Sequence, residues 1–253
     1  MTIARSLVTV PCLKDNYAFL FRAGGRTVCV DVPEAAPIRQ ALAERGWTLT
    51  DILLTHHHDD HIAGVADLVE AHGAKVWGAD ADAHRLPPLD HAVAPGDEVV
   101  IGPETARVWD VSGHTMGHVA YVFDDVAFTG DSLMAAGCGR LFEGDAATMH
   151  ASLSRFDDLP DETLIASGHE YTANNLAFAL SLEPDNPALT SRMSETEAAR
   201  ERGEATVPSA LGLERHTNPF LRVRDPALKA ATGTTGQSDS DTFAAARHAK
   251  DAF

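Results

Sequence analysis

The chain has 253 residues, of which 44% are hydrophobic and 23% are charged, and 20 Lys and Arg against 37 Asp and Glu leave a net charge of −17. This composition excludes a fully disordered chain, and the length allows one large domain or two modest ones. The acidic balance argues against nucleic acid as a partner, because it repels a phosphate backbone.

The first 170 residues mix short strands with helices. Runs rich in β-branched and aromatic residues, bounded by turn signals, predict strands at 7–11, 17–22, 27–32, 51–55, 75–77, 99–101, 107–111, 119–123, 126–129 and 163–166. Apolar residues at helical spacing predict helices at 34–45, 62–71 and 146–156. The two β-rich stretches predict two sheets packed together with helices outside them.

After about residue 171 helical patterns take over. They predict helices at 174–182, 188–201, 227–231 and 242–250, with a polar loop at 232–241. We therefore predict a mixed β/α domain at residues 1–172 and a mostly helical domain at residues 173–253.

The strongest chemical signal is the segment THHHDDH at residues 55–61, directly after a predicted buried strand. Side chains alternate between the faces of an extended strand, so His56, His58 and Asp60 tend to one side, and His61 follows at once. Imidazole and carboxylate groups suit zinc, iron or manganese without any thiolate. A solvated loop is a poor explanation for six such residues in a row. His57 and Asp59, which lie between these candidate ligands, are expected to point away from the metal.

Three further candidates follow later strands. His114, Asp131 and His169 each come shortly after a predicted strand and directly after a glycine, which lets the backbone turn sharply. Alone, each would more often be a turn or capping residue. The repeated pattern favours a shared metal centre.

Longer motifs carry a resemblance to a known family. THHHDDH is similar to the T-H-x-H-x-D-H signature of the metallo-β-lactamase superfamily, and PCLKDNY, SGHTMGH, FTGDSL, GCGRLFEG and SGHEYTANN together resemble glyoxalase II, the hydroxyacylglutathione hydrolases. The similarity runs from residue 11 to the C-terminus. It implies an α/β fold, the αβ/βα sandwich of two mixed β-sheets flanked by helices, and a C-terminal α-helical domain that helps to bind glutathione.

The resemblance also implies two metal sites. The first ion would be held by His56, His58 and His114, the second by Asp60, His61 and His169, and Asp131 would bridge the two. Zinc is the first expectation, with iron or manganese as alternatives, because the same nitrogen and oxygen ligands accept all three. Asp60 and Asp131 are expected to be catalytic as well, since their carboxylates set the charge of the centre.

The implied reaction is hydrolysis of S-(2-hydroxyacyl)glutathione, typically S-D-lactoylglutathione, to glutathione and D-lactate by a metal-bridging hydroxide, the second step of methylglyoxal detoxification. Two divalent ions, two carboxylates and a hydroxide leave a charge of about +1, which favours hydroxide near neutral pH and stabilises an oxyanion. The leaving thiolate, whose conjugate acid has a pKa of about 8.5, departs without a dedicated general acid. No such acid is obvious beside the motifs.

Glutathione is an anion, so an acidic protein needs a local basic patch to bind it. The resemblance implies that Arg140, Arg247 and Lys250 supply this patch and that Tyr171 adds a hydroxyl. Phe142 stands where the family often has Tyr, which removes one hydrogen bond to the substrate.

Other functions of the same signature remain as alternatives. A lactonase, a β-lactamase or another thioesterase is disfavoured by the helical tail with its basic end. A mono-iron sulfur dioxygenase would not need Asp60, His61 and His169 as metal ligands. An RNA-processing nuclease conflicts with the charge of −17. A metal-binding relative without activity is disfavoured because every expected ligand is present.

The cysteines predict the compartment. Cys12, Cys29 and Cys138 lie far apart and cannot all pair, which favours a reduced, cytoplasmic setting. No uncharged apolar run approaches the about 20 residues of a membrane span, and the short apolar stretch 6–13 lacks a signal-peptide cleavage site. We expect a monomer that contacts neither membrane nor nucleic acid.

Overall fold

The computed structural model of the chain describes residues 3–253, which form two compact units. Unit 1 comprises the residues up to Val111, with Gly117–Gly130 and Ala166–His169. Unit 2 comprises Ser112–Met116, Asp131–Ile165 and Glu170–Phe253. Each unit thus draws on several stretches of the chain. The separate substrate domain at residues 173–253 stays a prediction.

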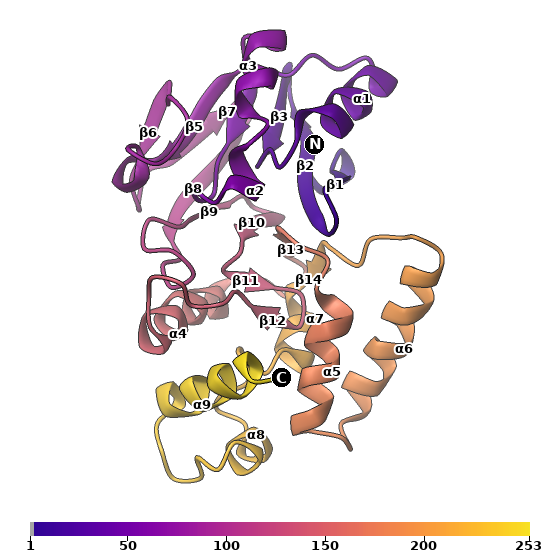
Figure 1. The fold of residues 1–253 in the computed structure, drawn as a ribbon, viewed down its shortest axis with the longest axis vertical. Helices are drawn as coiled ribbons and strands as arrows, with labels where there is room; N and C mark the ends of the chain where they lie inside the picture. Colours follow the sequence, from indigo (N-terminus) through magenta and orange to yellow (C-terminus); the bar gives the residue numbers. More distant parts are fainter. Residues whose placement is uncertain (1–2) are drawn as a thin grey trace. The chain divides into compact units, whose positions relative to one another are not determined.

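Unit 1 contains a six-stranded mixed sheet in the order β1-β2-β3-β4-β5-β6 (Figure 1). Its strands are β1 (Val8–Cys12), β2 (Asn16–Ala23), β3 (Arg26–Val30), β4 (Asp51–Leu53), β5 (Lys75–Ala79) and β6 (His91–Val93). The first three pair antiparallel and the last four parallel. Tight turns connect the antiparallel strands, whereas α1 (Ala35–Arg45) and α3 (Val65–His72) lie in the longer crossovers that parallel pairing requires.

A second sheet follows the order β14-β13-β10-β9-β8-β7. Its strands are β7 (Glu98–Ile101), β8 (Glu104–Asp110), β9 (Val119–Val122), β10 (Val126–Gly130), β13 (Leu164–Ser167) and β14 (Ser209–Ala210). Strands β7 to β10 pair antiparallel in chain order. Within β13, residues 166–167 belong to unit 1 and residues 164–165 to unit 2, where they pair with β14.

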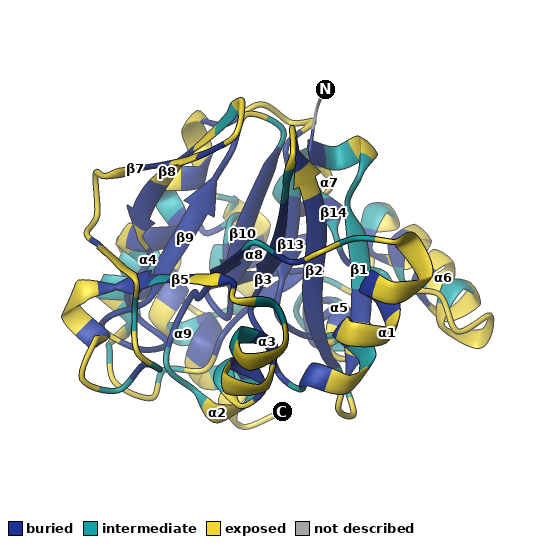
Figure 2. Ribbon diagram, turned by 90° about the horizontal axis from the view of Figure 1, so that it is seen from above, coloured by how far each residue is buried: buried dark blue, intermediate teal, exposed yellow. Residues whose placement is uncertain are grey.

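The core of unit 1 lies between its sheets and under its helices. Phe19 and Phe21 of β2 contact Phe128 of β10, with ring centroids 5.8 and 5.4 Å apart. Leu20, between them in sequence, packs with Ile38 of α1 on the opposite face, as the alternation of a strand requires. Figure 2 shows β2, β3, β9 and β10 mostly buried and the outer sides of α1 and α3 exposed. The predicted pair of packed sheets with helices outside is confirmed.

Unit 2 is mostly helical. Its helices are α4 (Ala146–Ser154), α5 (Thr172–Leu182), α6 (Pro187–Glu201), α7 (Leu211–Thr217), α8 (Pro226–Ala231) and α9 (Asp239–Asp251), and β11 (Leu133–Met134) pairs with β12 (Gly137–Cys138). Helices α5 and α6 lie side by side around Leu176, Ala179 and Leu189 (Figure 1). The helical C-terminal region is confirmed.

Several boundaries differ from the predictions for physical reasons. Helix α9 begins three residues early because Ser238 and Asp241 form a capping box at the end of the polar loop. The short helix α2 (Asp59–Ile62) and the strands β6, β11, β12 and β14 were not predicted, because elements this short show no periodic pattern, and α7 was also missed. Among the described residues, no helix combines the length and apolar character needed to cross a membrane.

Candidate metal centre

The loop after β4 carries most of the predicted ligands of unit 1. The strand ends at Leu53, and the backbone stays extended to His58, whose φ and ψ are −64° and 141°. The short helix α2 (Asp59–Ile62) then turns the chain back. As a result the ring of His61 returns beside that of His56, with centroids 4.1 Å apart.

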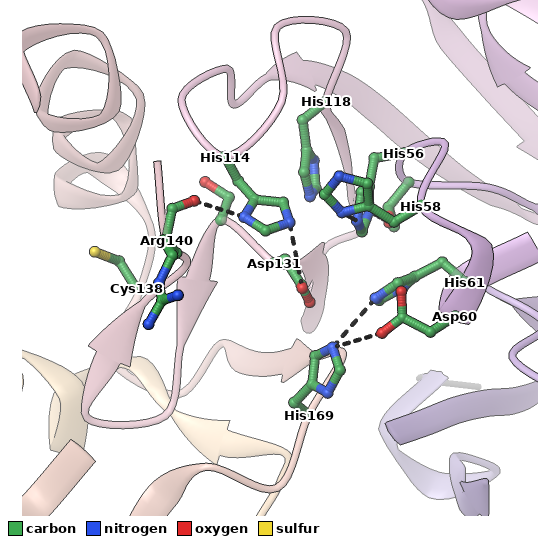
Figure 3. A network of polar contacts seen from close by, with 12 residues as sticks. His56, His58, Asp60, His61, His114, His118, Asp131, Cys138, Arg140 and His169 are labelled. Atoms are coloured by element: carbon green, nitrogen blue, oxygen red, sulfur yellow. Dashed lines mark hydrogen bonds and ion pairs between the residues drawn. The ribbon is translucent and has the colours of Figure 1, made fainter. Parts of the chain in front are cut away.

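Asp60, His61 and His169 form one compact group of donor atoms in unit 1. Their ligand atoms all lie within 4.8 Å of one another. Nε2 of His169 lies 3.4 Å from Nε2 of His61 and 3.4 Å from Oδ2 of Asp60 (Figure 3). These are the residues predicted for the second metal ion.

Hydrogen bonds to the outer ring nitrogens show which atoms of this group face inward. His61 donates from Nδ1 to Oδ2 of Asp31 at 2.8 Å, and His169 donates from Nδ1 to Oδ1 of Asp15 at 3.1 Å. Because neutral imidazole carries one proton, both Nε2 atoms hold lone pairs, and these face each other. Two opposed lone pairs repel, whereas a divalent cation between them would bind both, so the donor set fits a metal ion.

His56 and His58 form a second close pair. Nε2 of His56 lies 3.2 Å from Nδ1 of His58 (Figure 3). The buried His118 stacks on His56, with centroids 4.6 Å apart and 13° between the ring planes. His118 thus packs behind a predicted ligand and restricts the tilt of its ring.

The predicted ligands His114 and Asp131 belong to unit 2, where they contact each other. Nε2 of His114 lies 3.4 Å from Oδ2 of Asp131 (Figure 3). His114 donates from Nδ1 to the backbone oxygen of Arg140 at 2.7 Å, so its lone pair is again on Nε2. Gly113 and Gly130, which precede these residues, have φ of 144° and 49°, which confirms the predicted sharp turns.

The predicted substrate-binding cations also lie in unit 2, near the end of α9. Asp251 accepts from Nη2 of Arg247 at 2.8 Å and lies 3.8 Å from Nε of Arg140. Arg247 is only 5% exposed and donates to the backbone oxygen of Cys138 at 3.0 Å. Lys250 donates to the side-chain and backbone oxygens of Asn174.

The two predicted aromatic contacts differ in setting. Phe142 is 62% exposed, its backbone N–H donates to the oxygen of His114 at 3.2 Å, and its ring centroid lies 5.2 Å from that of His114. An apolar ring beside a predicted ligand offers contact but no hydrogen bond. Tyr171 is exposed and occupies the position just before the first residue of α5.

Residues that hold the ligands from behind were not predicted as part of the site. Asp31 is buried at the end of β3 and accepts from His61, and Asn16 donates from Nδ2 to the backbone oxygen and to Oδ2 of Asp60, both at 3.0 Å. The buried Asp82 accepts from Nδ1 of His57 at 3.1 Å. A signal for Asp31 exists, because parallel β3 and β4 end at the same sheet edge.

Comparisons with known proteins agree over nearly the whole chain. Residues 15–169 match the metallo-beta-lactamase superfamily, and residues 170–253 match the family described as hydroxyacylglutathione hydrolase C-terminus. The chain is 60% identical over 251 residues to a protein of Cereibacter sphaeroides and 59% identical over 251 residues to one of Jannaschia sp., with 98% of both chains covered in each case. Both relatives are named hydroxyacylglutathione hydrolase.

Solved structures support the fold. The chain is similar to the BLEG-1 B3 metallo-beta-lactamase, with a TM-score of 0.66 and 23% identity over 85% of this chain and 99% of that one. It is also similar to ETHE1 from Myxococcus xanthus, with a TM-score of 0.56 and 28% identity over 85% of this chain and 97% of that one. The predicted metallo-β-lactamase fold is therefore confirmed.

Proposed function

The chain belongs to the hydroxyacylglutathione hydrolase family of the metallo-β-lactamase superfamily, and we propose on this premise that it hydrolyses S-(2-hydroxyacyl)glutathione, with S-D-lactoylglutathione as the typical substrate. The products are glutathione and a 2-hydroxy acid such as D-lactate. The relatives near 60% identity over almost the full length carry this proposal. The chemistry of the donor groups supports it.

Divalent metal ions are the cofactors that this superfamily and these His and Asp groups indicate. We propose two zinc ions. His56, His58 and His114 would hold the first, Asp60, His61 and His169 the second, and Asp131 would bridge them. The nitrogen-rich sets favour zinc over magnesium or calcium, which prefer oxygen ligands.

The chain's own residues prepare this chemistry before substrate arrives. Bound metal ions would supply a nucleophilic water at neutral pH and polarise the thioester carbonyl. Asp31 and Asp15 hold the protons of His61 and His169 on the outer nitrogens, which keeps both Nε2 atoms ready to bind. Asn16 fixes the carboxylate of Asp60. The leaving thiolate needs no proton donor, because a thiolate whose conjugate acid has a pKa of about 8.5 is only a weak base.

The group formed by Asp60, His61 and His169 favours this function over a mono-iron oxygenase. Such an enzyme needs only one metal-binding set. Here the donor atoms of Asp60, His61 and His169 form a second set and lie within 4.8 Å of one another, with ring tautomers that suit a metal. Hydrolysis by a dinuclear centre uses both sets.

The proposal is tested by following the loss of thioester absorbance of S-D-lactoylglutathione, with metal analysis of the same sample. We expect rapid hydrolysis and about two metal ions per chain. One iron per chain, with oxygen uptake on a persulfide and no hydrolysis, would instead identify an oxygenase.

Lys250 is proposed to bind a carboxylate of the glutathione moiety. Its Nζ lies 5.3 and 5.2 Å from the ring centroids of Phe178 and Phe253. Burial, and secondarily the charge of Arg247, lowers the pKa of Lys250 to about 8. The side-chain amine of Lys250 is thus mostly protonated and charged below about pH 8, and mostly neutral above it.

We therefore expect KM to rise by up to about fivefold, the equivalent of one partly exposed ion pair, as the pH passes upward through 8. The value of kcat should change less, because the contact is remote from the thioester. The measurement is a pair of pH profiles from 6.5 to about 9.5. In the Lys250→Arg variant, which stays charged, the rise should vanish. If KM rises equally in both proteins, Lys250 does not bind the substrate.

The state of the cysteines bears on the compartment of the protein. Cys12, Cys29 and Cys138 are all buried and unbridged, which supports a reducing, cytoplasmic setting. Burial raises the pKa of the Cys138 thiol to about 11, which supports a structural role for it. We propose a monomer.

A further inference from the structure

The hairpin β11–β12 of unit 2 is held by side chains from the C-terminal helical region. A two-stranded hairpin is marginal by itself, so its backbone groups need other partners. Asn218 donates from Nδ2 to the oxygens of Met134 at 3.1 Å and Gly137 at 2.9 Å. Further contacts run from Asn175 to the oxygen of Ala135, from the N–H of Ala136 to Glu214, and from Arg247 to the oxygen of Cys138.

Glu214 is the centre of this arrangement. It is completely buried, and its carboxylate accepts from Nη2 of Arg192 at 2.5 Å, from the hydroxyl of Ser209 at 2.6 Å and from the N–H of Ala136 at 2.7 Å. Ala136 has a φ of 55°, a conformation that costs energy for a residue with a Cβ atom. The charge-assisted bond to Glu214 offsets this cost and holds the hairpin tip.

The hairpin in turn sets two predicted metal ligands. Gly139, where the chain leaves the hairpin, donates from its backbone N–H to the backbone oxygen of Ser132 at 3.0 Å. A Cβ atom on Gly139 would lie 1.9 Å from the backbone oxygen of Asp131. The next residue, Arg140, accepts the Nδ1 proton of His114 at 2.7 Å. A shift of the hairpin would therefore move both the backbone of Asp131 and the acceptor that orients His114.

We propose that Glu214, Asn218 and Asn175 form a clamp on the hairpin, and that they are positioning residues for His114 and Asp131. The C-terminal helices would thus serve the metal centre as well as the substrate. This inference rests on the ligand set of the proposed function, but not on the identity of the substrate.

The test uses Asn218→Ala, because a change at Glu214 would remove the carboxylate that pairs with the buried charge of Arg192 and would strongly destabilise the fold. This variant keeps the ion pair between Glu214 and Arg192, but it removes two bonds to the hairpin and the bond from Nδ2 of Asn218 to Oε2 of Glu214 at 3.2 Å. We expect its affinity for Co²⁺, measured by chelator competition on metal-free protein, to fall about tenfold or more. Amides of residues 131–140 should also exchange with solvent faster than in the unsubstituted protein.

Thr217→Val is the matched control. Thr217 is buried beside Asn218 and accepts from Nη1 of Arg192 at 2.5 Å, but its hydroxyl bonds Arg192 and Leu213 and not the hairpin. It should lower the melting temperature without weakening Co²⁺ binding. Unchanged Co²⁺ affinity in Asn218→Ala, or an equal loss in Thr217→Val, would overturn the clamp. These measurements use no substrate. They can therefore support the clamp even if the protein does not hydrolyse the proposed thioester.

Discussion

Replacing Asp131 by alanine is expected to lower thioester hydrolysis by more than about 100-fold and to reduce the bound metal below two ions per chain. Loss of a group that only supports a metal ligand already costs about 10- to 100-fold, and Asp131 is proposed as a ligand of both ions. Its carboxylate is buried and lies 3.4 Å from Nε2 of His114. Metal analysis and the lactoylglutathione assay check both effects.

Asp131→Asn is the control that separates charge from shape. The amide keeps the size of the carboxylate but removes its negative charge, so it should bind metal better than alanine and still catalyse poorly. Full metal content with a normal rate in Asp131→Ala would show that this residue does not bridge two ions. The other six proposed ligands would then need a different arrangement.

The sequence predicts the ligands because each lies at the end of an element. THHHDDH follows β4, and the glycines before His114 and Asp131 mark turns after β8 and β10 that the structure confirms by their positive φ. The two packed sheets were predictable because most of their strands are runs rich in β-branched and aromatic residues that turn signals bound. The short β14 and the hairpin β11–β12 were not predictable, because tertiary contacts and not local pattern form them.

The residues behind the ligands were harder to find. Asp82 lies 25 positions from the histidine that it holds, and Glu214 lies 78 positions from the hairpin residue that it binds. A lone acidic residue has no sequence signal of such a partner. The family motifs therefore identify the proposed metal ligands. The residues that hydrogen-bond to those ligands are identified only by the three-dimensional structure.

Asp31→Asn tests one of these supporting residues in unit 1. Asp31 is 3% exposed, and its carboxylate accepts from Nδ1 of His61 at 2.8 Å and from the N–H and hydroxyl of Thr55 at 2.9 and 2.8 Å. Asparagine tolerates the φ of 54° at this position, so the backbone should not change. Its NH₂ group cannot accept the proton of His61, so the ring loses its fixed orientation. We expect about 10- to 100-fold weaker metal binding.

Asp51→Asn supplies the matched comparison in the same sheet. Asp51 is also fully buried and accepts from Nε of Arg26 at 2.8 Å and from Nε1 of Trp77 at 3.1 Å, away from every proposed ligand. Asp31→Asn leaves buried donors with a weaker partner and Asp51→Asn leaves partly buried ones, and each change should cost about 1–3 kcal/mol of unfolding free energy. Only Asp31→Asn should also weaken metal binding in chelator titrations. If the two variants lose metal equally, the loss reflects general destabilisation, and Asp31 does not orient His61.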